Sequence, residues 1–353
     1  MSTQLFFEDI EQGQEVGPLL KGPLTSMHLM RWSAAIENWH RIHYDAPFAT
    51  GHDGLPDVVV AGSWKQHVLA QLFKDWAGRG GWLRSLRFQY RGTDACGATL
   101  GARGRVIGLE RRTGFGLVRC SVELSDAGNA SNTLGEAVVM LPLRGGDTVP
   151  EPLQPTEDAV PCAVARSPLS PAASRLLGPH QTSQVGKWSE RQYAPEPVER
   201  GAIRRFAQAI MDPDPWYADD AAAQAGRFGQ IVAPPLFPLH ALRRAAGTPD
   251  PLSAAVADPH FDGFGQLSTI LGLESLDLPL KRFLNGGSDH TMFSLARMGE
   301  RISVLSRYED LYVKDGKDGP LVFAVIHSRF EAEAPAAAGR RPLLSTRQTY
   351  VWR

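Results

Sequence analysis

Apolar and polar positions in the first half of the chain follow a helical period in two segments and a strand period after them. Residues 27–38 repeat apolar side chains at helical spacing, directly after the helix-start signal PLTS. A second, longer helix is predicted for residues 64–78, opening at Gly62 and Ser63 after the apolar run VVVA. Alternating positions broken by glycine-rich turns then indicate strands at residues 83–92, 99–110, 115–126 and 135–143.

The second half repeats this order of elements. An amphipathic helix is predicted for residues 197–212, followed by a loop, the apolar run IVAPP, a helix start at 236–244, and strands at 301–314, 319–333 and 343–353. Six pairs of like residues lie 174 positions apart: Arg31 and Arg205, Trp32 and Phe206, Ala35 and Ala209, Ile36 and Ile210, Asn38 and Asp212, Asp45 and Asp219. The sequence therefore predicts an internal duplication with two copies.

A proline-dense segment divides the two copies. It cannot hold regular helix or sheet, so we interpret residues 147–172 as a linker between domains at 1–146 and 173–353. A unit of helix, loop, long helix and antiparallel strands indicates a curved sheet wrapped around one central helix, an α+β arrangement. Two such units are expected to join their sheets edge to edge, which hides exposed strand edges.

Composition narrows the class of protein. The chain has 353 residues, 43% of them hydrophobic and 21% charged, with a net charge of −1. This balance is globular and offers no basic surplus for nucleic acid. The amino terminus lacks the features of a signal peptide, and no run approaches a membrane span. The three cysteines are far apart and show no metal-ligand spacing, which indicates a reduced compartment. Together with the charge balance and the missing apolar run, this predicts a cytoplasmic protein that binds neither nucleic acid nor membrane.

The loop after the first helix carries a family resemblance. The run HRIHYD at residues 40–45, with GLPDVVVAG downstream, resembles the MaoC-like or hydratase-2 branch of the hotdog superfamily. This variant is similar to the motif of 3-methylfumaryl-CoA hydratases and of mitochondrial hydroxyacyl-thioester dehydratases. The resemblance covers nearly the whole chain outside the linker. It implies a tandem double hotdog fold and reversible, (R)-type addition of water to a 2-enoyl thioester.

Three positions carry the chemistry that this resemblance implies. His43 is the candidate acid and base, because the pKa of imidazole lies near neutral pH; a structural loop histidine is its alternative. Asn38 stands where the family has a carboxylate, so we expect it to orient water, unless it is a plain helix cap. A backbone N–H at Gly62 or Ser63, at the positive end of the long helix, is expected to hold the thioester oxygen; a packing glycine is the alternative.

Further residues near the loop are candidates for substrate binding. His40 stands where the family often has Asn, Arg41 replaces the usual Pro, and Asp45 keeps the acidic position. His40 and Asp45 could also help His43 in proton transfer, as could Glu37.

Three arginines alternate with apolar residues on the strand predicted at 83–92: Arg84, Arg87 and Arg91. The alternation is typical of a solvated strand face; the alternative is a contact from Arg87 to the phosphates of coenzyme A or of a pantetheine arm.

The second copy is expected to be catalytically silent. Tyr217 occupies the histidine position, and Pro234 and Pro235 lie near where Gly62 would map. Proline has no N–H to donate. Asp212 keeps a carboxylate, which we interpret as a cap or pocket residue. In two-domain hydratases that resemble this chain the amino-terminal half is often the silent one, so the order here is reversed.

We therefore predict an enoyl-thioester hydratase or dehydratase with one site per chain between the two halves, assembled as a homodimer. No metal or redox cofactor is expected, and coenzyme A or carrier-protein pantetheine would enter as part of the substrate; the acyl group stays open, branched and dicarboxylic groups included. One alternative is a hotdog thioesterase, which needs a carboxylate on the long helix, where only Asp75 is available. The other is a non-catalytic subunit that binds acyl thioesters.

Overall fold

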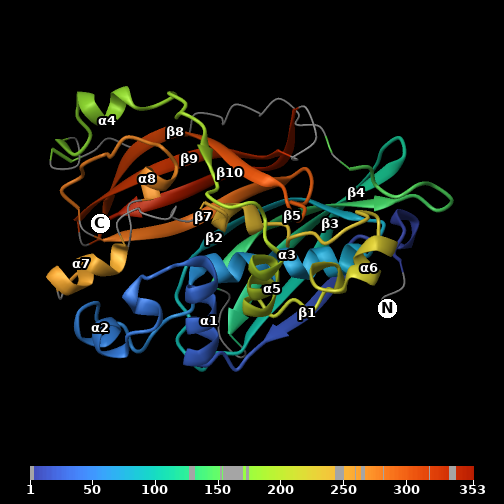
Figure 1. Ribbon diagram of the computed structural model, residues 1–353, viewed down its shortest axis with the longest axis horizontal. Helices are drawn as coiled ribbons and strands as arrows, with labels where there is room; N and C mark the ends of the chain where they lie inside the picture. Colours follow the sequence, from blue (N-terminus) through green and yellow to red (C-terminus); the bar gives the residue numbers. More distant parts are fainter. Residues whose placement is uncertain are drawn as a thin grey trace.

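The strands of the chain form one continuous antiparallel sheet (Figure 1). The computed structural model describes residues 4–126, 132–151, 153, 170–171, 175–242, 250–258, 260–263, 267–280, 282–317, 319–333 and 339–353. Most of the linker predicted at 147–172 therefore lies outside the described residues.

The first half supplies five strands and the helices α1 to α3. Its elements are β1 (Glu15–Lys21), α1 (Ser26–Ile36), α2 (Ala46–Gly51), α3 (Gly62–Ala77), β2 (Trp82–Tyr90), β3 (Leu100–Arg111), β4 (Phe115–Asp126) and β5 (Thr133–Pro142). The predicted helices and the four predicted strands of this half are confirmed, while β1 was not predicted.

The second half also supplies five strands. Its elements are α4 (Pro179–Ser183), β6 (Gln192–Tyr193), α5 (Arg200–Ala209), α6 (Asp220–Ala225), α7 (Pro251–Ala257), α8 (Leu267–Ile270), β7 (Phe283–Met292), β8 (Arg301–Gly316), β9 (Gly319–Glu333) and β10 (Arg340–Trp352). The three predicted strands of this half are confirmed as β8 to β10, and β6 and β7 were not predicted.

The ten strands follow the order β1-β3-β4-β5-β2-β7-β10-β9-β8-β6, so each half contributes one side of the sheet. β2 and β7 form the junction, with Leu86 opposite His290 in an antiparallel ladder. The second half therefore repeats the first in mirrored strand order. The expected edge-to-edge joining of two hotdog units, an α+β tandem double hotdog, is confirmed.

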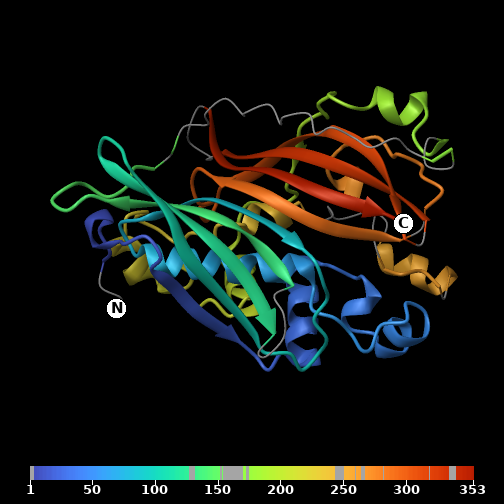
Figure 2. The ribbon, with the colours of Figure 1, turned by 180° about the vertical axis from the view of Figure 1, so that it is seen from behind.

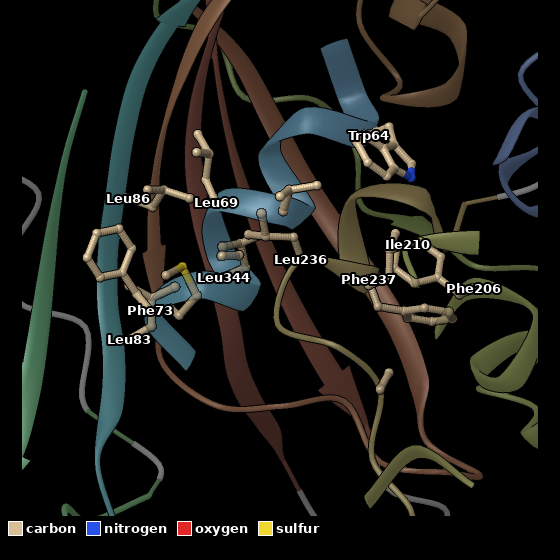
Figure 3. Packing of buried hydrophobic residues seen from close by; sticks show 14 of the residues in the cluster. Trp64, Leu69, Phe73, Leu83, Leu86, Phe206, Ile210, Leu236, Phe237 and Leu344 are labelled. Carbon is tan, nitrogen blue, oxygen red and sulfur yellow. The ribbon is translucent and has the colours of Figure 1, made fainter. Parts of the chain in front are cut away.

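Helix α3 is the central helix of the first half. It contacts β1 to β5, and α1, α5 and α6 gather on the same side of the sheet (Figures 1 and 2). Leu69 and Phe73 are buried on α3, toward Leu83 and Leu86 of β2 and toward Leu344 of β10 (Figure 3). A helix enclosed by both halves buries nearly every side of its surface. No described helix is both long and apolar enough to span a lipid bilayer.

The second half lacks a counterpart of α3 among the described residues, contrary to the helix start expected at 236–244. Only a short 3-10 helix, Phe237–His240, forms there. Pro235 and Pro238 account for the difference, because proline removes the N–H groups that a continuing α-helix needs.

The predicted duplication is confirmed in the loops that follow α1 and α5. Glu37 and Met211, 174 positions apart, both adopt a left-handed conformation, with φ of 52° and 55°. The 3-10 helices Arg41–His43 and Pro215–Tyr217 follow at the same spacing, and then α2 and α6.

Candidate functional site

A cavity of about 1330 Å³ opens between the two halves. Its walls come from the loop after α1, the first turn of α3, the end of β2, and several segments of the second half between residues 239 and 285. The predicted site residues that line it are Asn38, His40, His43, Gly62 and Ser63.

His43 ends the 3-10 helix Arg41–His43 and is only 8% exposed. Its Nδ1 donates to the carbonyl oxygen of Val59 over 2.8 Å, which leaves Nε2 as the nitrogen that can take up a proton. Burial, followed by the nearby charge of His40, lowers the pKa of His43 to about 4. The ring is therefore neutral at neutral pH and can act as a base.

Asn38 and His40 are joined by a local hydrogen bond. The Oδ1 of Asn38 accepts the N–H of His40 over 3.2 Å, which fixes the turn between α1 and the 3-10 helix. The ring of His40 lies edge-on to that of His43, with centroids 5.5 Å apart. Burial lowers the pKa of His40 to about 4, so this ring is neutral as well.

Arg41 and Asp45, predicted to bind substrate, do not line the cavity. Arg41 forms an ion pair with Asp45 at 2.7 Å, and its N–H donates to the carbonyl of Asp262 over 2.8 Å. The Asp45 carboxylate also accepts the N–H of Phe48 and so caps α2. The Arg41 guanidinium also donates to the carbonyl of Phe261 over 3.3 Å, so Arg41 holds the loop against the second half.

Gly62 and Ser63 form the first turn of α3, where N–H groups have no acceptor within the helix. The Oγ of Ser63 accepts the indole N–H of Trp32 over 3.1 Å. Tyr90 donates its hydroxyl to the carbonyl of Gly62, and a Cβ at Gly62 would lie 3.2 Å from the Tyr90 ring. A side chain at residue 62 would therefore pack tightly against Tyr90, and the first turn of α3 presents N–H donors to the cavity.

Arg87, predicted to bind substrate, is exposed and does not line the cavity. Strand alternation turns Leu86 and Phe88 into the core, so Arg87 faces outward, opposite Asp289 of β7. The solvated-face interpretation therefore holds for Arg87. The end of β2, by contrast, brings Arg91 to the cavity, together with Arg282 and Arg353 from the second half.

The second copy of the loop faces Lys74, from the last turn of α3. The Lys74 ammonium lies 3.2 Å from Asp212, 2.9 Å from Asp214 and 2.7 Å from Asp75. Burial alone would lower the pKa of Lys74, but the surrounding anionic groups raise it well above its usual value. The three carboxylates could geometrically hold a metal ion, yet the Lys74 ammonium already lies within 3.2 Å of each of them.

Tyr217 stands in this copy where His43 stands in the first. It is 1% exposed, and its hydroxyl has no hydrogen-bond partner among the described residues. Pro235 occupies the position that corresponds to Gly62. Val60, two residues before Gly62, donates its N–H to the carbonyl of Asp94, and Ala233, two residues before Pro235, donates its N–H to the carbonyl of Ala296 in the same way. This copy has neither an imidazole nor an N–H at these positions.

Sequence reasoning missed several polar residues of the cavity, among them Lys65, Gln66, Tyr90 and His240. Lys65 and Gln66 belong to the predicted long helix, one turn after Gly62, and helical spacing could have indicated them. His290 of β7 is fully buried, and its Nε2 lies 3.1 Å from the Oε1 of Gln66.

The chain matches two families of dehydratases. Residues 16–98 match the hydroxyacyl-thioester dehydratase type 2 family, and residues 183–335 match the FAS1-like dehydratase domain region. A UPF0336 protein of Streptomyces avermitilis is 31% identical over 133 residues, which is 38% of this chain and 75% of that protein. A UPF0336 protein of Streptomyces griseus is 31% identical over 131 residues, which is 36% of this chain and 73% of that protein.

Solved structures share the fold over the whole chain. A MaoC-domain dehydratase of Chloroflexus aurantiacus has a TM-score of 0.63 at 14% identity, covering 99% of this chain and 98% of that one. A Mycobacterium tuberculosis protein described as a double hotdog fold has a TM-score of 0.58 at 16% identity, covering 99% of both chains.

The chain has the double hotdog fold of these structures, and two of its segments match dehydratase families. The chain belongs to the UPF0336 family.

Proposed function

We propose that this chain catalyses the reversible, (R)-type addition of water to a 2-enoyl thioester, at one site between its two halves with the catalytic groups from the first half. The observation that carries the proposal is the arrangement of His43 and the first turn of α3 around one cavity. His43 has its Nδ1 engaged by Val59, so Nε2 can move a proton, and Gly62 and Ser63 offer N–H groups to an oxygen.

The proposed reaction uses one proton shuttle. Nε2 of His43 takes a proton from water while the water oxygen bonds to C3 of the enoyl group. The electrons of the double bond move toward the thioester carbonyl, whose oxygen gains negative charge and is stabilised by the N–H groups of Gly62 and Ser63. The imidazolium then returns the proton to C2. Asn38 is proposed to orient the water through the NH₂ of its amide, since its Oδ1 already accepts the N–H of His40.

The dimensions of the cavity support a bulky acyl group, with branched and dicarboxylic groups as candidates. Its volume of about 1330 Å³ exceeds the roughly 300–1,000 Å³ of common small-molecule pockets. Arg91, Arg282 and Arg353 are exposed at its lining and have the charge to bind the phosphates of coenzyme A or of a carrier's pantetheine arm.

The remaining elements of the proposal follow from the sequence. The reaction as written needs no metal or redox cofactor, because the imidazole and the backbone donors supply its acid, base and charge stabilisation. The free thiols of Cys96 and Cys120 fit a cytoplasmic location. A homodimer is proposed as the assembly.

The thioesterase alternative finds little support at the cavity. The α3 residues that line it are Gly62, Ser63, Lys65 and Gln66, and none of them carries a carboxylate. Asp75, the one candidate on this helix, is paired with Lys74 at the second copy.

Incubation with enoyl-CoA substrates tests the proposal. Crotonyl-CoA, a methyl-branched enoyl-CoA and a dicarboxylic enoyl-CoA are each incubated with the protein, while enoyl absorbance and free thiol are followed. We expect enoyl absorbance to fall with at least one substrate, without thiol release and with a 3-hydroxyacyl-CoA as product. Thiol release without hydration would favour a thioesterase, and no change with any acyl group would favour a non-catalytic binding subunit.

A further inference from the structure

Tyr90 lies at the end of β2, against the first turn of α3. Its hydroxyl donates to the carbonyl oxygen of Gly62, and its ring packs where a Cβ of residue 62 would stand. Tyr90 also lines the large cavity. A strand of the sheet and the start of the central helix are thus joined by one hydrogen bond at the candidate site.

The acceptor of this bond belongs to the same peptide group as the N–H of Ser63. A peptide group is planar, so fixing its carbonyl also fixes the direction of its N–H. A hydrogen bond accepted by the carbonyl polarises the group as well and makes the N–H at its other end a stronger donor. Tyr90 therefore acts on the Ser63 N–H without touching whatever that N–H binds.

The surroundings of Tyr90 keep it in place and protonated. Burial, followed by the neighbouring Tyr350, raises the pKa of Tyr90 well above its usual value, so the hydroxyl remains a donor at working pH. Its ring lies 5.1 Å from that of Phe88 and 5.8 Å from the ammonium of Lys65. Lys65 forms an ion pair with Asp94, and both side chains are only 2% exposed. This pair holds the Lys65 ammonium in place beside the Tyr90 ring.

The second copy lacks this arrangement. Leu236 follows Pro235 where Ser63 follows Gly62, and the turn there is a short 3-10 helix. The bond from a sheet tyrosine to the start of a central helix thus occurs in the copy that has His43 where the other copy has Tyr217.

We propose that Tyr90 is a positioning residue that orients and polarises the Gly62–Ser63 peptide, so that the Ser63 N–H binds the thioester carbonyl oxygen. This inference rests on the proposed function for its reaction, but carbonyl binding can be measured without turnover.

The test is Tyr90→Phe, which removes only the hydroxyl. Tyr308→Phe is the matched control, because Tyr308 also donates to a backbone carbonyl, that of Glu274 over 2.8 Å, in the second half and away from the cavity. Loss of a direct oxyanion donor costs about 10²–10³-fold in kcat, and an indirect one should cost less. With crotonyl-CoA we therefore expect Tyr90→Phe to lower kcat about tenfold with KM nearly unchanged, and Tyr308→Phe to leave both unchanged.

A spectroscopic measurement separates this inference from the proposed function. The chromophore 4-(dimethylamino)cinnamoyl-CoA absorbs at longer wavelength when its carbonyl is polarised. We expect a red shift on binding to the wild type and to Tyr308→Phe, and a smaller one with Tyr90→Phe. If the protein shows no hydratase activity but the red shift still depends on Tyr90, the positioning role of Tyr90 is supported and the proposed function fails. Equal shifts and equal kcat in all three proteins, or no shift in the wild type, would overturn the inference.

Discussion

The loop that follows α1 and the loop that follows α5 share one backbone and differ in what faces them. In the first, Asn38 accepts the N–H of His40 over 3.2 Å; in the second, Asp212 accepts the N–H of Asp214 over 3.2 Å. Each loop continues into a 3-10 helix and then a capped short helix. The first opens on a cavity, whereas the second is filled by Lys74.

The difference follows from one central helix. α3 extends from the first copy's site to the second copy's loop, where its last turn places Lys74 among carboxylates. The described residues of the second half form no such helix. A duplicated motif thus becomes a candidate site in one copy and a structural ion cluster in the other, depending on what the opposite half contributes.

A large effect is expected when Gly62, at the start of α3, is replaced by the proline that the second half has at the corresponding position, Pro235. Gly62→Pro removes an N–H proposed to hold the thioester oxygen, so kcat/KM for hydration should fall by about 10²–10³-fold. The measurement is steady-state hydration of the best enoyl-CoA, with circular dichroism to confirm that the fold is kept.

Gly62→Ala is the control for this change, since it keeps the N–H but adds a Cβ that would lie 3.2 Å from the Tyr90 ring. We expect it to lose much less activity than Gly62→Pro. If the two variants were equally impaired, the packing of residue 62 rather than its N–H would explain the loss.

The second prediction concerns the loop after α5, which Lys74 fills. Lys74→Met leaves Asp212 buried without its cation, and breaking a buried pair costs about 3–5 kcal/mol. We expect a loss of stability near the lower end of that range, because Arg79 still neutralises Asp214 at 2.8 Å. Urea unfolding measures the loss, and kcat at a temperature where the variant is folded should be unchanged. A large fall in kcat with normal stability would show that the second copy takes part in the reaction.

The dependence of activity on pH sharpens the comparison further. His43 must be neutral to act as a base, and its pKa is about 4 because it is buried, against an ordinary value of 6.5. The acid limb of kcat/KM should therefore fall near pH 4, with nearly full activity at pH 6. An acid limb at pH 6.5 would contradict this environment for His43.

The same pKa shift also affects stability, so folding must be followed as a control. The unfolded state binds protons at these histidines below pH 6.5, whereas folded His43 and His40 do so only near pH 4. Stability due to their neutral burial is thus complete above pH 6.5 and declines as the pH falls toward 4. Circular dichroism at each pH separates loss of fold from loss of chemistry.

The sequence predicted the elements whose signals are local. α1, α3, the strands β2 to β5 and β8 to β10, and the duplication all have periodic patterns or matched positions. Pro235 and Pro238 argue against a second central helix, yet the match between the two copies suggested a helix there. Strand alternation also placed Arg87 on the outer face.

Contacts between distant segments carry no local pattern, and they account for what was missed. Lys74 reaches Asp212 across 138 positions, and Arg41 is bound to Asp45 and to a segment of the second half rather than to the cavity. β7 shows little apolar alternation, because it carries buried polar residues such as His290, which is paired with Thr346 over 2.8 Å. Such placements are decided by the packing of the two halves.

The most direct test of the central claim compares the two equivalent positions, His43 and Tyr217, in one hydration assay. We predict that His43→Gln lowers kcat/KM about 10³-fold while the protein stays folded, because the imidazole carries both proton transfers. Tyr217→Phe should leave kcat/KM within about twofold, since the hydroxyl it removes faces no substrate. Near-normal hydration by His43→Gln, or a comparable loss in Tyr217→Phe, would contradict a single competent copy.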